Sequence, residues 1–180
     1  MNVVLVLSGG TGTRLGASVP KQYCTIAGKP VIVHTLEQFQ KCHGVAGVIV
    51  VALAEWRAKI LVWKEAYGLS KLWAIAPAGA DRQLSIRNGL TAAKGYMKEA
   101  AGGVIVQDAA RPLTSQDLLA RLVQGLEEAP AVMPVLPITD TTYTSRDGQW
   151  VDGLLDRRTL FAGQAPEAFR YRPYLKLYEE

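Results

Sequence analysis

A glycine-rich loop with basic residues behind it follows the first apolar run of the chain. Three glycines fall within residues 9–12, and Arg14 and Lys21 follow. Glycines let backbone N–H groups approach phosphate oxygens, and two nearby cations suit a triphosphate. A Walker A loop is excluded because no Gly-Lys-Ser/Thr follows, and Gly16 stands one residue too late for the dinucleotide fingerprint GxGxxG. A tight turn without a ligand is the alternative interpretation.

Two further segments combine an apolar run with residues that bind anions or metals. Asp108 directly follows "VIVQ", and Arg111 stands three residues later. Mg²⁺ binds through one or two carboxylates plus substrate phosphates, so Asp108 is a candidate ligand, with a helix cap as the alternative. In "AGADRQLSIRNG" (78–89), another strand-to-helix junction contains Gly79, Asp81, Arg82 and Ser85. Ser85 would hydrogen-bond a base or ribose, and a capped helix start without a ligand is the alternative for this segment.

Short apolar runs alternate with amphipathic segments, which predicts the elements that position these residues. The nearly continuous hydrophobicity of the runs is typical of strands covered on both faces, and the repeated β-α order predicts an α/β fold with a mostly parallel, doubly wound sheet. Ligands bind at the carboxyl ends of such strands. Ser115 is a candidate N-cap. The predicted strands are 2–7, 45–53, 71–76, 102–108 and 130–138, and the predicted helices are 31–42, 54–68, 81–100 and 115–129.

The pattern changes after residue 138. The segment 141–153 predicts a β-hairpin that turns at Asp147-Gly148, within a protruding arm at about 139–160. A last helical stretch, 171–180, follows.

Composition restricts the class of protein. The 180 residues are 49% hydrophobic and 20% charged, which predicts one globular domain over residues 1–180. No run approaches the roughly 20 apolar residues of a membrane span, and the start lacks a signal-peptide pattern, so we expect a cytoplasmic protein with no membrane partner. Cys24 and Cys42 are expected to be free thiols. The net charge of +4 is dispersed, so nucleic-acid binding is not predicted.

Six motifs in order resemble one enzyme family. They are "GGTGTRLG" with "PKQ", "GKPVIVHTL", "ADRQLSIRNGL", "DAARP", "PITDT" and "DRRTLFAGQ". Together they resemble the cytidylyltransferases that activate sugar-alcohol phosphates, namely the 2-C-methyl-D-erythritol 4-phosphate cytidylyltransferases and the related ribitol-5-phosphate cytidylyltransferases.

The resemblance implies a Rossmann-like nucleotidyltransferase fold, CTP as substrate, Mg²⁺ as cofactor and a homodimer formed through the arm. It also implies roles for particular residues. CTP would be held by the glycine loop, which consists of Ser8, Gly9, Gly10, Thr11, Gly12 and Thr13. Arg14 and Lys21 would flank the α-phosphate of CTP, and Gly79 and Ser85 would face its cytosine. Asp108 would bind Mg²⁺ with Arg111 near the acceptor, and the acceptor phosphate would be contacted across the dimer by Thr141 and Arg157.

The implied reaction needs no protein nucleophile. The acceptor phosphate, already anionic, attacks the α-phosphorus of CTP in line and pyrophosphate leaves, so catalysis consists of positioning and charge stabilisation. We expect 2-C-methyl-D-erythritol 4-phosphate as the acceptor, in isoprenoid precursor synthesis. The alternatives are ribitol 5-phosphate, which would give CDP-ribitol, and a nucleotide-binding domain without turnover.

The sequence departs from the family pattern at several positions. Gln107 stands where a histidine is common, Tyr143 where methylerythritol enzymes have a lysine, and Ala165 where a threonine is usual. The family's C-terminal segment is also absent from the sequence, which leads us to expect a truncated chain or a short variant.

Overall fold

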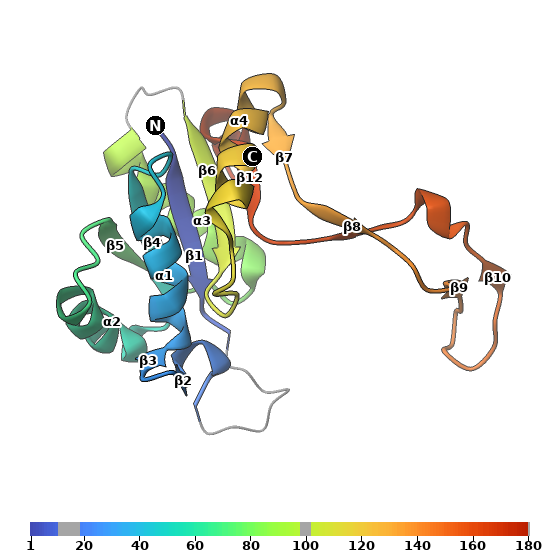
Figure 1. Ribbon diagram of the computed structural model, residues 1–180, viewed down its shortest axis with the longest axis horizontal. Helices are drawn as coiled ribbons and strands as arrows, with labels where there is room; N and C mark the ends of the chain where they lie inside the picture. Colours follow the sequence, from blue (N-terminus) through green and yellow to red (C-terminus); the bar gives the residue numbers. More distant parts are fainter. Residues whose placement is uncertain (11–18, 98–101, 180) are drawn as a thin grey trace.

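A mostly parallel six-stranded sheet forms the centre of the molecule (Figure 1). The computed structural model describes residues 1–10, 19–97 and 102–179. Four neighbouring strands are parallel, and β12 is antiparallel to both of its neighbours. In sheet order the strands are β5 (Leu72–Pro77), β4 (Gly47–Ala52), β1 (Val3–Ser8), β6 (Gly103–Asp108), β12 (Glu167–Arg170) and β7 (Ala131–Val132).

Helices cover both faces of this sheet (Figure 1). Alternate strand residues face opposite sides, so Val4 and Val6 pack in one core with α1 (Val31–Lys41), α2 (Ala54–Ala66) and α4 (Gln116–Glu128). Val3 and Leu5 pack in the other core, with α3 (Arg82–Met97) and the start of α5 (Tyr171–Lys176). Burial on both faces explains the continuous hydrophobic runs and confirms the predicted fold class. None of the helices in the described part of the chain is long and apolar enough to cross a membrane.

The first four predicted strands and the four predicted helices are confirmed, except that residues 98–100 of the helix predicted over 81–100 fall outside the described residues. The last predicted helix, 171–180, is confirmed only over Tyr171–Lys176. Ser115 caps α4 by accepting a hydrogen bond from the Leu118 N–H at 3.2 Å. The prediction of one strand over 130–138 is wrong. The segment instead forms β7 and the separate strand β8 (Val135–Pro137), which pair in different sheets. Pro134, which lies between the two strands, has no N–H to donate, so a regular ladder is not continued through this point. The sequence analysis did not predict β12.

An arm formed by two antiparallel ladders projects from the sheet (Figure 1). At its base β8 pairs with β11 (Phe161–Gly163), and nearer its tip β9 (Tyr143–Thr144) pairs with β10 (Gly153–Leu154). The 3-10 helix η3 (Arg157–Thr159) lies between β10 and β11. The hairpin and its turn at Asp147-Gly148 are confirmed, since Gly148 has φ +74° and the Asp147 carboxylate accepts the N–H groups of Gln149 and Trp150. The arm is longer than predicted because its base ladder includes residues 135–137 and 161–163.

Candidate nucleotide site

The end of β1 is held by a short 3-10 helix, η2 (Lys21–Tyr23). The buried Gln22 amide donates to the Ser8 carbonyl at 3.0 Å and to the Gly10 carbonyl at 2.7 Å. The Ser8 hydroxyl donates to the Tyr23 hydroxyl at 2.7 Å, which in turn donates to the Ser8 carbonyl at 3.1 Å. These bonds fix the exposed Lys21 next to the start of the glycine loop. Sequence reasoning missed Gln22 and Tyr23, although "PKQY" places both directly after the lysine.

Helix α2 supports η2 from the outside. The Trp56 ring stacks on the Tyr23 ring with centroids 3.8 Å apart, and the Trp63 ring lies at 6.0 Å. Burial raises the pKa of the Tyr23 phenol, and its hydrogen bonds to Ser8 and Gln22 offset part of that rise. The phenol therefore stays neutral and can both donate and accept at Ser8. The β2–β3 ladder (Thr25–Ile26 with Lys29–Pro30) leads from η2 into α1.

The turn between β5 and α3 lies against the end of β1. A Cβ on Gly9 would come 2.7 Å from the Ala78 Cβ and 3.8 Å from the Ser85 hydroxyl oxygen, so only a glycine allows this approach. Gly79 is equally confined, because its Cβ would lie 2.3 Å from the Leu84 Cβ. The structure therefore brings the glycine loop and the "AGADRQLSIRNG" segment into contact.

Ser85 and Asp81 organise the first turn of α3. The Ser85 hydroxyl accepts a hydrogen bond from the Gly79 N–H at 2.9 Å, and the Asp81 carboxylate accepts from the Leu84 N–H at 2.7 Å. The aspartate acts as a cap, as the structural alternative for this motif predicted. The Ser85 hydroxyl also has a hydrogen of its own to donate to a nucleobase.

The "DAARP" motif forms a turn at the end of β6. Asp108 stands opposite Leu7 in the sheet, and the Ala109 N–H donates to the Leu7 carbonyl at 2.9 Å. Asp108 therefore lies at the same edge as Ser8. Arg111 Nε contacts Asp108 Oδ2 at 3.0 Å, and the two side chains are 52% and 39% exposed. Because both side chains are exposed, both charged groups are accessible to a charged ligand. An ion pair this exposed also adds little stability, so a ligand can replace it at little cost.

Two of the predicted site residues in the described part of the chain lie away from this assembled edge, and four others are not among the described residues. Thr11, Gly12, Thr13 and Arg14 fall outside the described residues. Thr141 lies in the arm, as does η3 with Arg157, and the arm projects away from this edge of its own chain (Figure 1). Arg157 donates from Nη1 to the Thr139 carbonyl at 2.9 Å, which ties the two sides of the arm together. The predicted contact with the acceptor across a dimer stays a prediction.

The donor set at this edge fits magnesium bound together with phosphates. Within residues 1–10, 19–97 and 102–179, no three His, Cys, Asp or Glu side chains gather in the way a cage made entirely of protein ligands requires. Mg²⁺ needs only one or two carboxylates when substrate phosphates and water complete its octahedron. The accessible Asp108 carboxylate meets that requirement.

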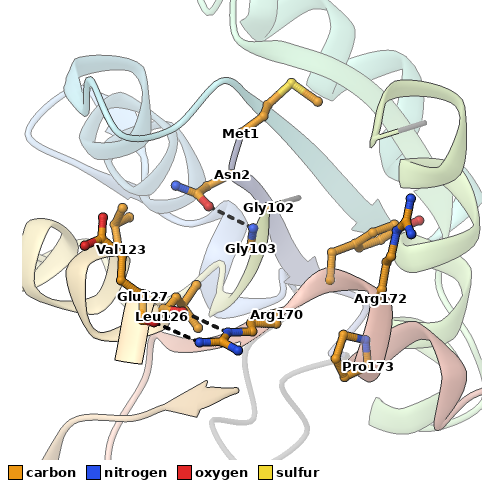
Figure 2. A pocket seen from close by; sticks show the side chains of 11 residues that line it. Met1, Asn2, Gly102, Gly103, Val123, Leu126, Glu127, Arg170, Arg172 and Pro173 are labelled. Atoms are coloured by element: carbon orange, nitrogen blue, oxygen red, sulfur yellow. Dashed lines mark hydrogen bonds between the residues drawn. The ribbon is translucent and has the colours of Figure 1, made fainter. Parts of the chain in front are cut away.

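A cavity of about 470 Å³ lies at the opposite end of the sheet, where β1 and β6 begin (Figure 2). Two polar side chains that line it, Asn2 and Arg170, are engaged in holding the fold together. Asn2 Oδ1 accepts from the Gly103 N–H at 2.8 Å, and the Arg170 guanidinium donates to the carbonyls of Leu126 and Glu127, each at 2.9 Å. None of the predicted site residues that the structure describes lines this cavity.

The mostly parallel sheet, with a glycine-rich first loop and a carboxylate at the carboxyl ends of its strands, defines an α/β protein of the Rossmann-like nucleotide-binding class. Comparison with known proteins narrows this class. The chain belongs to the 2-C-methyl-D-erythritol 4-phosphate cytidylyltransferases, because the family pattern matches residues 2–180. This confirms the predicted family and identifies the chain as a member of an enzyme family.

Individual relatives agree with this assignment. The chain is 37% identical over 172 residues to a 2-C-methyl-D-erythritol 4-phosphate cytidylyltransferase from Cereibacter sphaeroides, covering 95% of this chain and 73% of the relative. It is 29% identical over 170 residues to a ribitol-5-phosphate cytidylyltransferase from Streptococcus agalactiae, covering 94% and 70%. The solved 4-diphosphocytidyl-2C-methyl-D-erythritol synthase from Anaerococcus prevotii has the same fold, with a TM-score of 0.83 at 22% identity over 99% of this chain and 74% of that one.

Proposed function

We propose that this chain transfers CMP from CTP to 2-C-methyl-D-erythritol 4-phosphate in a Mg²⁺-dependent reaction that releases pyrophosphate. The observation that carries the proposal is the meeting of the Ser8–Gly10 segment, the Gly79–Ser85 turn and the Asp108–Arg111 pair at one sheet edge. The 37% identical relative, which is named for this acceptor, supports the choice of substrate.

The residues at this edge have separate tasks in the proposed reaction. An oxygen of the acceptor phosphate forms a bond to the α-phosphorus of CTP, and the bond to the β-phosphate oxygen breaks. Lys21, exposed next to the start of the glycine loop, stabilises negative charge on the transferring phosphate. Ser85 and the Gly79 turn orient the base. Asp108 would hold Mg²⁺, which when bound neutralises phosphate charge, and Arg111 lies next to it.

Ribitol 5-phosphate is the second candidate acceptor. One relative carries that name, and Tyr143, exposed on the arm, replaces the lysine of the methylerythritol pattern. A site that hydrogen-bonds an additional hydroxyl rejects an analogue lacking it strongly, so a clear preference is expected rather than equal use of the two acceptors.

We further propose that two copies associate through the arm. Its described residues expose several large apolar side chains, and an isolated two-stranded ladder is marginal in water. A symmetric second copy would cover these side chains and bring Thr141 and Arg157 to the partner's nucleotide edge. The exposed apolar residues of the arm include Leu136, Trp150, Val151, Leu154 and Phe161.

Light scattering tests the dimer. Trp150→Ser, at a side chain 76% exposed, should shift the mass from dimer to monomer, whereas Leu61→Ser, at an exposed apolar side chain on α2, should not. A wild-type chain that is monomeric at micromolar concentration would contradict the proposal.

Pyrophosphate release tests the reaction. The wild-type chain is assayed with CTP and Mg²⁺ against each acceptor, and CTP binding is measured separately by calorimetry. We expect a higher kcat/KM for 2-C-methyl-D-erythritol 4-phosphate. A kcat/KM at least tenfold higher for ribitol 5-phosphate would show that ribitol 5-phosphate is the acceptor. CTP binding without turnover of either acceptor would indicate a nucleotide-binding domain instead.

A further inference from the structure

Two buried polar side chains hold the turn that carries Asp108 and Arg111 from beneath. Gln107 Nε2 donates to the Arg111 carbonyl at 2.9 Å and to the Asp108 carbonyl at 3.2 Å. Thr35 Oγ1, on α1, donates to the Ala109 carbonyl at 2.8 Å. Three backbone carbonyls within one four-residue turn are therefore bound by side chains from inside the fold.

Gln107 is placed where an apolar residue would otherwise stand. It is fully buried, and the three residues before it on β6 are the fully buried Val104, Ile105 and Val106. Alternation along the strand puts Gln107 on the same face as Ile105, towards the core that contains α1. A buried amide is costly unless it is hydrogen-bonded, so packing alone does not account for it.

The orientation of the Gln107 amide follows from its neighbours. Its nitrogen meets two carbonyl oxygens, whereas Oε1 has no partner among the described residues. The reverse orientation would direct an oxygen at both carbonyls. The two bonds to the turn are therefore the polar contacts this side chain makes in the described structure.

The charged pair cannot hold the turn in the same way. Asp108 and Arg111 are both substantially exposed, and exposed ion pairs contribute little. We propose that Gln107 and Thr35 are positioning residues, which fix the 108–111 turn so that the Asp108 carboxylate and the Arg111 guanidinium meet Mg²⁺ and the nucleotide phosphates. The proposal rests on the function proposed above.

Matched variants separate this role from general stability. Gln107→Met keeps the length of the side chain but removes the donor, and Thr35→Val removes the hydroxyl while keeping the shape. Thr35→Ser restores the hydroxyl and is the rescue variant. Thr91→Val is the control, because the Thr91 hydroxyl donates to the carbonyl four residues earlier on an exposed helix face and has no bond to the turn. Thr35 Oγ1 lies 3.3 Å from the equivalent carbonyl of its own helix, but its nearer acceptor is Ala109.

Three readouts are needed: amide hydrogen exchange at Ala109 and Arg111 in the ligand-free protein, calorimetric binding of CTP with Mg²⁺, and kcat and KM for pyrophosphate release. Losing the partner of a buried carbonyl should speed exchange in Gln107→Met and Thr35→Val by about tenfold and weaken Mg²⁺·CTP binding by a similar factor. Thr35→Ser and Thr91→Val should behave as wild type.

Unchanged exchange at the turn in both variants would overturn the proposal, and so would faster exchange with unchanged Mg²⁺·CTP binding. If only one variant has an effect, the other residue is removed from the proposal. If Gln107→Met does not fold, the single-hydroxyl change in Thr35→Val decides.

A wild type that binds Mg²⁺·CTP but transfers CMP to neither acceptor refutes the proposed function, while exchange and binding still decide this inference. A wild type that does not bind Mg²⁺·CTP overturns both.

Discussion

Gly9 packs tightly against the turn between β5 and α3, and Gly9→Ala should disturb both folding and CTP binding. The new Cβ would lie 2.7 Å from the Ala78 Cβ, whereas carbon atoms pack favourably at about 3.5–4.0 Å. Gly9 does not adopt the left-handed φ that penalises other residues, so the cost is steric. Ala78 has no rotamer with which to move its Cβ away, and the backbone must therefore shift.

The expected cost is that of overpacking a tight contact, about 2 kcal/mol. For a chain of this length that lowers Tm by roughly 4–8 °C. The shift separates Ser8–Gly10 from the Gly79–Ser85 turn, so the Kd for CTP should rise as well.

Ala78→Gly provides the compensating change. With the Ala78 Cβ removed, the Gly9→Ala methyl would meet the Ala78 Cα and the Ser85 hydroxyl oxygen, each at 3.8 Å, which is an ordinary contact distance. The single change Ala78→Gly should cost about 0.4–1 kcal/mol through chain entropy. The double variant should therefore be more stable than Gly9→Ala alone and should regain CTP binding.

Urea unfolding of the four proteins in this double-mutant cycle, with CTP titrations by calorimetry, measures the coupling. Gly95→Ala serves as the control, because a Cβ there meets nothing within 4 Å and should add about 1 kcal/mol of helix stability. Additive free energies of unfolding in the double variant would refute the reasoning, since they would show that the two residues do not clash.

The remaining predictions concern charge. Lys21→Ala should lower kcat by about 10²–10³-fold in the pyrophosphate assay with little change in unfolding, because the side chain is exposed; near wild-type turnover would remove its role at the α-phosphate. Asp108→Asn should raise the Mg²⁺ concentration needed for half-maximal rate without loss of fold, and an unchanged Mg²⁺ dependence would place the metal elsewhere. At the arm tip, hydrogen bonds from the N–H groups of Gln149 and Trp150 lower the pKa of the Asp147 carboxyl below its unfolded value of 3.8. The ionised carboxylate therefore stabilises the folded turn fully above pH 3.8, and this contribution to stability is lost as the pH falls through the folded pKa. Amide chemical shifts of Gln149 and Trp150 should report this acid transition, and they should lose it in Asp147→Asn.

The sequence predicted those features that depend on interactions between residues close together in the chain. Continuous apolar runs between helical patterns predicted the parallel core because strands buried on both faces need no polar alternation. Ser115 and the Asp147-Gly148 turn were predictable because a capping hydroxyl and a left-handed glycine act within a few residues. The six motifs in order predicted the family.

The edge of the sheet next to β6 depended on tertiary structure. The segment Glu167–Arg170 has no strong strand pattern, yet it becomes β12 because it pairs along β6. The predicted strand at 130–138 is interrupted at Met133-Pro134, between β7 and β8, and the two pieces joined different sheets according to the partners available to each. The boundary of the arm followed from that break.

The sequence by itself determined the family, the fold class and the candidate residues Lys21, Ser85 and Asp108, because each stands at a strand end or in a motif that can be read locally. Only the tertiary structure decided what holds them. Gln22 and Tyr23 secure the end of β1, and Thr35, 74 residues away in the chain, binds the carbonyl of Ala109. Such contacts join segments that are distant in sequence, and a polar side chain does not reveal its partner until the fold has brought both into the same buried space.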